Sequence, residues 1–355
     1  MVPVVDLKRR HRRFRESFLA ATDRVLGSGS VLLGPELDGL ERELAPTLHG
    51  TTTSAEHTIG VANGAAALQL VMTALGIGPG DEVVVPAFTA VPTASAVCAT
   101  GATPVFADVD PATAAIDPTA AAAALTTRTR AVVVVHLYGR PTPVEPLLAF
   151  GLPVIEDAAQ AHGALHGVAG VATIYSFYPT KNVGGIGDGG AVVTPDLELA
   201  AAIRRLRAHG MTEQYVHVDI SQNFRMSELE AAWLTLQLPH LVDDNCRRAE
   251  IARRYRQAAP SARWHADHRD HVVHQCVLRH HDRDDVRAHL LARGISTGVH
   301  YPLALTQQPA YRHLTTAPCP QAEAWAAECI SLPCFPELTD DEVDLVASAL
   351  EDLGA

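Results

Sequence analysis

The chain has 355 residues, of which 47% are hydrophobic and 19% are charged, a composition typical of a globular protein large enough for two domains. This composition excludes a lone small binding module, a disordered chain and a collagen-like repeat. Forty acidic against 28 basic residues give a net charge of −12, so no bulk attraction draws the chain to nucleic acid or to anionic lipid.

Membrane, export and metal signals are weak in this sequence. The longest clean apolar stretch, residues 131–135, is far shorter than the roughly 18 residues that a membrane helix needs. The segment after Met1 has no continuous apolar core, and the six cysteines form neither a CxxC pair nor a zinc-ligand spacing. We therefore expect a cytoplasmic protein with reduced thiols, without membrane or nucleic-acid partners, although the basic run Arg9–Arg13 offers a local positive patch.

The predicted elements begin with two helices and continue as alternating strands and helices. The first 50 residues favour a helix, a glycine turn and a second helix at 35–48, after which short apolar runs predict strands. Predicted strands are 83–85, 104–107, 131–136, 153–156, 174–177 and 191–194, and predicted helices are 65–75, 119–125, 197–208 and 227–238. Strands bounded by helices indicate an α/β fold with a mostly parallel mixed sheet sandwiched by helices, and ligands gather at the carboxyl ends of such strands.

The character of the chain changes after Pro239. A long arginine-rich helix is followed by shorter alternating segments, which predicts a smaller α+β domain. Its predicted elements are a helix at 241–258, a strand at 272–278, a helix at 283–293, a strand at 296–301 and a helix at 340–353. We therefore expect a large domain at residues 1–240, including the N-terminal helical segment, and a small C-terminal domain at residues 241–355.

Lysine is rare in this chain. Only Lys8 and Lys181 are lysines among the 28 basic residues, so arginine serves almost everywhere that a positive charge is used. Arginine can neither lose its proton nor form a Schiff base, whereas a desolvated lysine can do both. Lys8 lies among arginines and is expected to be a solvated charge. Lys181 lies in an aromatic and glycine-rich segment. It is therefore either a reactive amine or a lysine that is present there by chance.

Three further positions suit an anion and a cation. The segment 61–65 is predicted to be a strand end, a glycine turn and a helix start, where backbone N–H groups and the helix dipole can bind a phosphate. Many α/β proteins have the same strand-to-helix connection without a phosphate site. Asp157 ends a buried strand and needs a partner, either a protonated ring nitrogen or the N-terminus of a helix. Ser176 lies a few residues before Lys181 and can reach the same phosphate.

Together these positions supply what pyridoxal phosphate requires: a phosphate cradle, a carboxylate for a pyridinium nitrogen and an amine for an aldehyde. Phe88 follows the predicted strand 83–85 and is available to stack on the ring, or it is an ordinary core aromatic. The glycine-rich run 184–190 is similar to a dinucleotide fingerprint. That fingerprint opens a helix, however, whereas this run leads into a predicted strand, so we reject an oxidoreductase.

Seven motifs follow one another along nearly the whole chain: Val4-Val-Asp-Leu-Lys8, Leu33-Gly-Pro-Glu36, Gly76-Ile-Gly-Pro-Gly-Asp-Glu-Val83, His136-Leu-Tyr-Gly139, Glu156-Asp-Ala-Ala-Gln-Ala-His-Gly163, Ser176-Phe-Tyr-Pro-Thr-Lys-Asn182 and Gly298-Val-His-Tyr-Pro302. In these motifs the sequence resembles the DegT/DnrJ/EryC1/StrS family of sugar aminotransferases. The resemblance implies pyridoxal 5'-phosphate as cofactor and the fold type I architecture of the enzymes that use it.

The resemblance also implies roles for the residues at the cofactor ring. Lys181 would bind the cofactor aldehyde covalently and act as general acid and base, and Asp157 would pair with the pyridine nitrogen as the second catalytic residue. Gln160 would lie beside the ring and its phenolic oxygen, and Phe88 would stack on the ring. No metal is expected.

At the other end of the cofactor, the resemblance places the phosphate between Ser176 and the amides of Gly64 and Ala65. Ala65 lacks the hydroxyl that is common in the family at this position, so one phosphate bond is expected to be lost. A segment of the partner subunit, residues 215–225, completes the site in this family, and its Asn223 would reach the phosphate of the other subunit. The resemblance therefore implies an obligate homodimer with shared active sites.

The implied reaction moves an amino group from glutamate or glutamine to a nucleotide-linked ketosugar, in aminosugar biosynthesis for a secondary metabolite or a surface glycan. A dTDP-3-keto-6-deoxyhexose is the favoured acceptor, and a dTDP-4-keto-6-deoxyhexose or a keto-inositol stays open. A related dehydratase branch has histidine in place of the reactive lysine, so Lys181 argues against that activity. The alternative that the protein is not an enzyme, but a regulatory protein that binds the cofactor without catalysis, also stays open.

Histidines recur at every third position at 265, 268, 271 and 274, a pattern that invites a metal site. Spacing of three does not place side chains on one face of a strand, and the surrounding arginines and aspartates are typical of a solvated surface. We therefore interpret this stretch as a solvated, flexible link. His136 and His162 fall in motifs near predicted strand ends and are expected to be pocket or structural residues.

Overall fold

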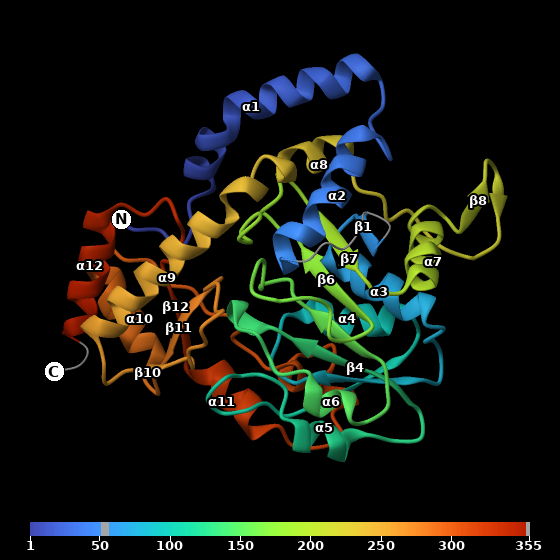
Figure 1. Ribbon diagram of the computed structural model, residues 1–355. Helices are drawn as coiled ribbons and strands as arrows, with labels where there is room; N and C mark the ends of the chain where they lie inside the picture. The colour runs from blue at the N-terminus through green and yellow to red at the C-terminus, as the bar shows by residue number, and fades with distance from the viewer. Residues whose placement is uncertain (51–56, 353–355) are drawn as a thin grey trace.

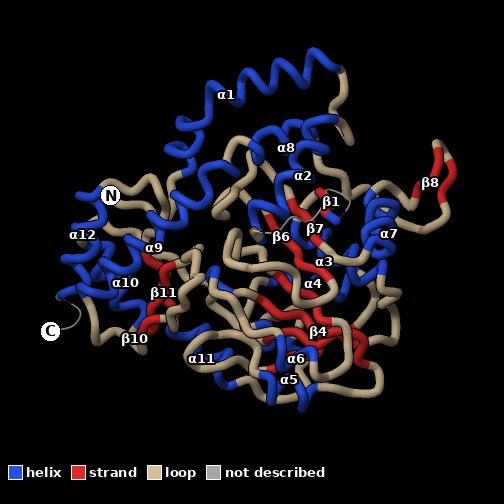
Figure 2. Tube along the Cα trace, in the orientation of Figure 1, coloured by secondary structure: helices blue, strands red, loops and turns tan. Residues whose placement is uncertain are grey.

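A seven-stranded sheet forms the centre of the protein (Figure 1, Figure 2) in a computed structural model that describes residues 1–50 and 57–352. Its strands lie in the order β1-β7-β6-β5-β4-β2-β3, and β7 runs antiparallel to both of its neighbours while β2 to β6 are parallel. The strands are β1 Thr58–Val61, β2 Glu82–Pro86, β3 Thr103–Ala107, β4 Thr129–Val135, β5 Val154–Asp157, β6 Ala172–Ser176 and β7 Gly190–Val193. This mixed, mostly parallel sheet confirms the predicted fold class.

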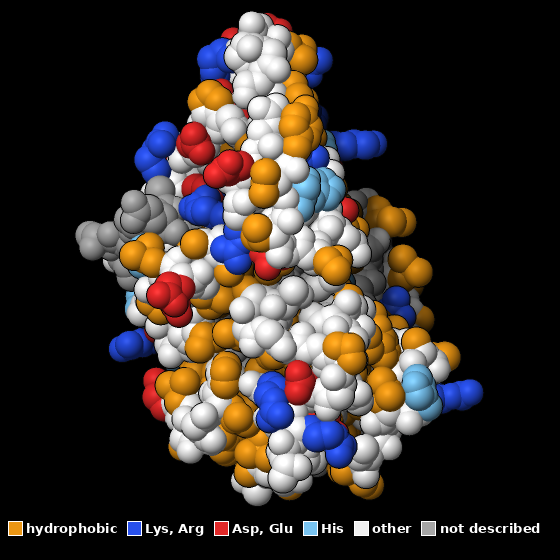
Figure 3. All heavy atoms as spheres, turned by 90° about the vertical axis from the view of Figure 1, so that its right-hand side faces the viewer, with side chains coloured by type: hydrophobic (Ala, Val, Ile, Leu, Met, Phe, Trp, Pro, Cys, Tyr) orange, Lys and Arg blue, Asp and Glu red, His pale blue; other side chains and the backbone are white. Residues whose placement is uncertain are grey.

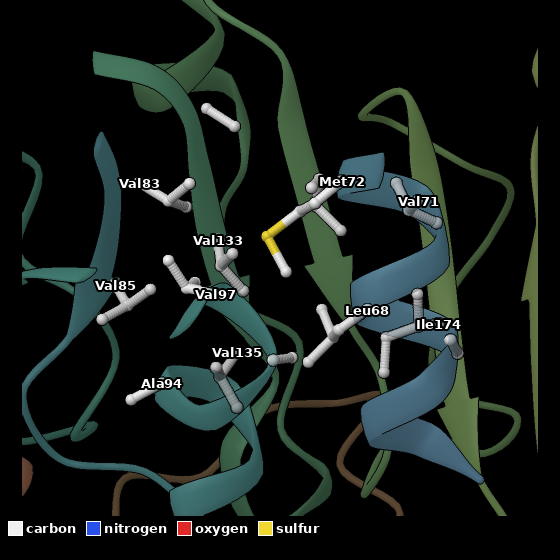
Figure 4. Packing of buried hydrophobic residues seen from close by; sticks show 14 of the residues in the cluster. Leu68, Val71, Met72, Val83, Val85, Ala94, Val97, Val133, Val135 and Ile174 are labelled. Atoms are coloured by element: carbon white, nitrogen blue, oxygen red, sulfur yellow. The ribbon is translucent and has the colours of Figure 1, made fainter. Parts of the chain in front are cut away.

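Helices cover both faces of the sheet. Because successive side chains of a strand point to opposite faces, the valine runs of β2 and β4 fill a core on each side. One core includes α3, α4 and α7, and Figure 4 shows Leu68 and Met72 of α3 directed toward Val133 of β4. The helices of the two layers are α2 Pro35–His49, α3 Gly64–Ala74, α4 Val91–Ala99, α5 Pro118–Ala124, α6 Glu145–Leu148, α7 Leu197–Arg207 and α8 Glu228–Thr235.

Two elements lie outside this sandwich. Helix α1, Leu7–Ser28, packs against α8, where the rings of Phe14 and Phe18 meet Trp233 edge-on at centroid distances of 5.9 and 5.0 Å. A short hairpin, β8 Met211–Glu213 with β9 Val216–His217, projects from the body beyond α7 (Figure 1). The sequence analysis predicted the helix but not the hairpin, whose strands are too short and too exposed to show an apolar alternation.

The C-terminal part contains a three-stranded antiparallel sheet, in the order β10-β11-β12, with helices packed against it. The predicted strand 272–278 is displaced to 276–279. The predicted strand 296–301 is wrong, because only Gly298 forms a bridge, to Ser331, and residues 329–332 occupy the strand position. The elements are α9 Leu241–Ala258, β10 Arg263–Trp264, β11 Cys276–Arg279, α10 Arg283–Ala292, α11 Pro320–Glu328, β12 Cys329–Leu332 and α12 Asp340–Glu351. The last predicted helical residue, Leu353, lies outside the described residues.

The hydrophobic cores cross the predicted boundary at residue 240. Val2 packs in the C-terminal core with Ile295, and Trp325 of α11 packs in the core of the central sheet. The boundary itself stays a prediction. Four 3₁₀ turns complete the described elements: η2 Leu137–Gly139, η3 Leu238–His240, η4 Leu305–Gln307 and η5 Arg312–Leu314. None of the described helices combines the length and the apolar character that crossing a bilayer would demand.

Candidate active site

A cavity of about 340 Å³ lies at the carboxyl ends of the parallel strands. The start of α3, the turn after β2, the ends of β4, β5 and β6, and the segment after β6 all contribute to its wall. Among the lining residues are Gly64, Ala65, Asp157, Gln160, Ser176 and Lys181. Six predicted site residues from three separate segments therefore meet around one cavity, as the strand-end rule predicts for an α/β sheet.

Lys181 lies on the segment between β6 and β7, residues 177–189, which we call the lysine loop. Its backbone N–H donates to the carbonyl of Tyr178 at 2.8 Å, which closes a tight turn. Burial lowers the pKa of the Lys181 amine to about 8, and the nearby Asp157 carboxylate opposes this shift. Roughly one tenth of the amine is then uncharged at pH 7, so it can act as a nucleophile and as a base.

Asp157 ends β5 and faces the same cavity with only 6% of its surface exposed. Burial raises the pKa of its carboxyl group, while the Ala159 N–H at 3.1 Å, the Lys181 charge and the Thr93 hydroxyl at 3.3 Å oppose the rise. Thr93 is not among the site residues that the sequence predicts. It lies in the first turn of α4 directly after β2, and this position beside a strand end is the signal that could have revealed it.

Gln160 has a fixed orientation beside the cavity. Its carbonyl oxygen accepts a hydrogen bond from the Tyr138 backbone N–H at 2.6 Å, and its amide nitrogen donates to the Tyr301 hydroxyl at 3.1 Å. Tyr301 also lines the cavity, and burial raises the pKa of its hydroxyl, so this group stays protonated at neutral pH. The pair presents two neutral polar groups to whatever the cavity holds.

The end of the cavity near α3 suits a phosphate. Asn63 caps α3 by accepting the Ala66 N–H at 2.8 Å, so the first amides of the helix point outward with the positive end of the dipole. Gly64 lies so close to β6 that an added Cβ would come within 2.7 Å of the Ser176 Cβ. Only a glycine lets the helix start approach the serine this closely, and the two together form a cradle of the size and polarity that a phosphate group requires.

Phe88 does not line the cavity. Its ring is fully buried and stacks on Trp325 of α11 at a centroid distance of 6.0 Å. Thr89 and Ala90, the next two residues, reach the cavity wall instead. The predicted stacking of Phe88 on the cofactor ring is therefore wrong for this geometry, and the core role that the sequence left open is the one observed. The helix that covers Phe88 lies more than 200 residues later in the chain, which is why a local pattern could not show it.

Asn223 lies away from the cavity of its own chain. It is on the exposed segment after the hairpin, where its carbonyl oxygen accepts a hydrogen bond from Arg225 Nε at 2.9 Å. Its predicted contact with the phosphate of a partner subunit stays a prediction.

The expected solvated histidine link is wrong for three of its four histidines. His265, His271 and His274 are buried, and each places a ring nitrogen near a protein acceptor: the Thr113 carbonyl, the Tyr138 carbonyl and the Asn182 side chain. The stretch is thus part of the packing between the C-terminal segment and the lysine loop. Within residues 1–50 and 57–352, side chains close enough to share a metal ion occur at His280, His281 and Asp282, and this set includes none of the four.

Glu230 of α8 is an acid buried behind the lysine loop. It is 4% exposed, and its carboxylate accepts the Gly187 N–H at 3.0 Å. Burial raises the pKa of Glu230 to about 7. Between pH 4.5 and 7 the folded protein then holds a proton that the unfolded chain has lost, so stability falls as pH rises through this window, by about 3 kcal/mol in total.

Replacing Glu230 with glutamine is expected to remove this loss. Glu230→Gln should unfold at a higher urea concentration than the wild type at pH 8, and the gain should shrink toward zero at pH 5. Glu43→Gln, at an exposed position of α2, is the matched control and should show no such difference. A gain that is equal at both pH values would contradict the buried charge as its cause.

The site matches pyridoxal phosphate group by group. The helix start with Ser176 suits the phosphate, the Asp157 carboxylate suits the ring nitrogen, and the lysine amine suits the aldehyde. The protein is accordingly a pyridoxal-phosphate enzyme with the fold type I architecture. The sequence profile of the DegT/DnrJ/EryC1/StrS aminotransferase family matches residues 12–351, and the chain belongs to this family. Similar solved structures include ntda of Bacillus subtilis with bound PMP, the aminated cofactor, at 29% identity and a TM-score of 0.87 over 94% of this chain and 80% of that one.

Individual relatives are similar over almost their full length. The dTDP-3-amino-3,4,6-trideoxy-alpha-D-glucose transaminase of Streptomyces venezuelae is 41% identical over 99% of this chain and 96% of its own. The crystal structure of S. venezuelae DesV in complex with a ketimine intermediate superposes with a TM-score of 0.94 at 41% identity, over 99% of this chain and 98% of that one. A protein of Geobacillus stearothermophilus described as a pleiotropic regulatory protein is 39% identical over 98% of this chain and 97% of its own.

Proposed function

We propose that the protein transfers an amino group from glutamate or glutamine to a nucleotide-linked keto-deoxysugar, specifically a dTDP-3-keto-6-deoxyhexose. The observation that carries the proposal is the pairing of Lys181 and Asp157 in one cavity of a chain that belongs to an aminotransferase family. The similarity to a dTDP-3-amino-sugar transaminase at 41% identity supports the 3-keto position and the dTDP carrier.

When bound, pyridoxal phosphate supplies an aldehyde and a ring that takes up electrons. Lys181 Nζ would hold the aldehyde end of the cofactor, and the same amine would serve as the base for the α-proton of the amino donor. The Asp157 carboxylate keeps a proton on the ring nitrogen, because a buried anion strongly favours a nearby cation. Ser176 and the first amides of α3 would hold the phosphate. This would keep the aldehyde end of the cofactor next to Lys181.

The substrate assignment is tested with the purified holoenzyme, glutamate or glutamine, and a panel of dTDP-3-ketosugars, dTDP-4-ketosugars and keto-inositols. Mass measurement should show an aminated product in the dTDP-3-keto arm. Amination confined to the 4-keto or inositol arm would replace the proposed acceptor with that alternative. A complete lack of turnover in every arm would overturn the transferase proposal.

A second candidate function is a regulatory protein that binds the cofactor without turnover. It is favoured by the similarity to the G. stearothermophilus protein, whose description is regulatory. The decisive measurement is the absorbance of the bound cofactor after glutamate is added. A spectral change with release of 2-oxoglutarate supports the enzyme, whereas an unchanged spectrum supports the regulatory candidate.

We also propose that the protein is a homodimer in which each subunit completes the other's active site. Apolar side chains are exposed along the hairpin and the segment after it: Met211, Tyr215, Val216, Val218 and Ile220. Figure 3 looks onto the side from which this hairpin projects. It shows hydrophobic side chains spread across the face, with charged side chains scattered among them. Exposed apolar groups of this kind are expected to be covered by a second subunit.

Shared sites predict complementation between an inactive variant and a variant with weakened cofactor binding. Asn223→Ala should weaken cofactor binding by roughly ten-fold, since one charge-assisted hydrogen bond to a phosphate is lost. In an equal mixture of reassembled Lys181→Ala and Asn223→Ala chains, assayed at limiting cofactor, half of the dimers contain one intact site. Activity should then reach about a quarter of the wild-type value by counting intact sites. Mixed dimers that stay inactive would contradict the shared site, and a monomer in solution would contradict the dimer.

A further inference from the structure

Three arginines of α1 contact three different parts of the protein. Arg9 donates to both carboxylate oxygens of Glu342 at 2.6 Å, and Arg13 donates to Asp244 at 2.8 Å. Arg10 is different, because its guanidinium donates from Nη1 to two main-chain carbonyls of the lysine loop. Each of these three arginines of the basic run therefore has a partner within the protein, although Arg13 itself stays exposed.

The two carbonyls that Arg10 contacts are those of Pro179, at 2.8 Å, and of Lys181 itself, at 3.0 Å. Arg10 is only 4% exposed, and burying a guanidinium is costly unless hydrogen bonds compensate for lost water. Asp244 and Glu337 attract the charge from a distance, whereas Arg248 repels it. The direct partners of this costly group are thus the backbone atoms around the reactive lysine.

Gly184 shows how closely Arg10 approaches the loop. A Cβ added at this position would lie 2.2 Å from Arg10 Nη1 and 2.2 Å from the Pro179 carbonyl oxygen. No larger residue could occupy position 184 while the guanidinium bridges the turn. The glycine and the arginine are therefore two parts of one contact, although 174 positions separate them in the sequence.

Further side-chain contacts hold the part of the loop that follows Lys181. Asn182 donates to the side chain of Asn245 at 2.8 Å and to the Val272 carbonyl at 3.0 Å. The Gly184 carbonyl accepts from Trp233 Nε1 and from Gln237 Nε2, both at 2.8 Å. Arg10 is the side chain that contacts the main chain of Lys181 from the other side, so it opposes rotation of the peptide from which the amine extends.

We infer that Arg10 is a positioning residue, which fixes the backbone of Lys181 so that the amine points into the cavity beside Asp157. The inference rests on the reactive role proposed for Lys181. Arg10 itself contacts no substrate. Because a misplacement of a reacting group by about 1 Å can cost roughly a hundred-fold in rate, a clamp on the peptide of Lys181 has a direct kinetic consequence.

The test compares Arg10→Met with Arg13→Met, a matched variant on the same helix that removes an ion pair with Asp244 and a cation–π contact with Phe14 but no contact with the lysine loop. In Arg10→Met holoenzyme, kcat should fall by about ten-fold or more while the KM for glutamate changes by less than about three-fold, because glutamate does not contact Arg10. Arg13→Met should keep both constants. Thermal melting of each variant establishes that it is folded, and Arg10→Gln replaces Arg10→Met under the same criteria if the latter does not fold.

A second readout uses neither substrate nor pyridoxal phosphate. In the full-length protein before cofactor loading, Lys181 is labelled with pyridoxal and borohydride across a pH series, and the modified peptide is measured by mass. The labelling midpoint should lie at about pH 8 in the wild type and in Arg13→Met. It should move upward by about one pH unit in Arg10→Met, because an amine that swings toward water regains its ordinary pKa.

These readouts separate the inference from the proposed function. A folded Arg10 variant with wild-type kcat and a wild-type labelling midpoint overturns the positioning role, whatever sugar the enzyme uses. An equal effect in Arg13→Met also overturns it, since docking of the whole helix would then be the cause. Loss of the sugar assignment leaves the labelling result intact, because that measurement involves no acceptor.

Discussion

Arginine in place of Lys181 is expected to lower transaminase turnover by roughly four orders of magnitude or more. Lys181→Arg keeps a positive charge in the cavity but cannot lose its proton near neutral pH, so it can neither attach to an aldehyde nor carry a proton from a carbon acid. The measurement is single-turnover release of 2-oxoglutarate from glutamate. Borohydride reduction of the holoenzyme should give a cofactor-labelled peptide that contains residue 181 in the wild type and no such peptide in the variant.

The chain offers a matched control for this experiment, because Lys8 is its one other lysine. Lys8 is exposed at the start of α1, and Lys8→Arg should retain the activity and the labelled peptide of the wild type. Turnover that survives in Lys181→Arg, or label found on Lys8, would remove the basis of the proposed mechanism.

The sequence singles out Lys181, which lies on the cavity wall, because chemistry restricts where a lysine is needed. Arginine can replace lysine at most exposed sites but not at a reactive amine, so a lysine in an arginine-rich chain is informative without any structure. The strand-end rule then predicts that residues after separate strands meet, and Asp157 and Ser176 do lie with Lys181 around one cavity. Both inferences depend on local sequence and on a general property of α/β sheets.

The predictions that failed depend on contacts between distant segments. Phe88 is in the core because α11 brings Trp325 to it. The three buried histidines contact partners that lie 92 to 152 positions earlier in the chain. The predicted strand 296–301 contains few apolar residues, and only its Gly298 bridges to Ser331 of β12, whose regular ladder is formed with β11. A local pattern shows that a segment can be buried or extended. Which other segment packs against it or pairs with it depends on the rest of the chain.

The contacts of Arg10 illustrate the same limit at the site itself. A run of charged residues in the first helix is ordinarily a solvated surface, and nothing in 9–13 distinguishes the residue that is buried from the two that pair with half-buried carboxylates. What selects Arg10 is the absence of a side chain at Gly184. The reactive loop therefore depends on a residue near the N-terminus that only three-dimensional packing brings within reach.

Asparagine in place of Asp157 is expected to be the second most damaging change, with kcat lower by roughly a thousand-fold. The variant is nearly isosteric, and its amide oxygen can still accept the Ala159 N–H, so the end of β5 should keep its shape. A neutral amide, however, cannot hold a proton on the ring nitrogen, and the cofactor ring then loses its capacity to take up electrons. KM for glutamate should change much less than kcat, because Asp157 acts on the ring rather than on the donor.

The same variant has a second, independent signature at Lys181. The Asp157 carboxylate stabilises the charged amine, so its removal should lower the pKa of Lys181 below about 8 and move the labelling midpoint toward lower pH. Thr93→Val, which removes only the hydroxyl at 3.3 Å from the carboxylate, should lower kcat by about ten-fold or less and leave that midpoint near the wild-type value. A labelling midpoint that does not move in Asp157→Asn would show that the carboxylate and the amine do not interact, and the paired site would have to be abandoned.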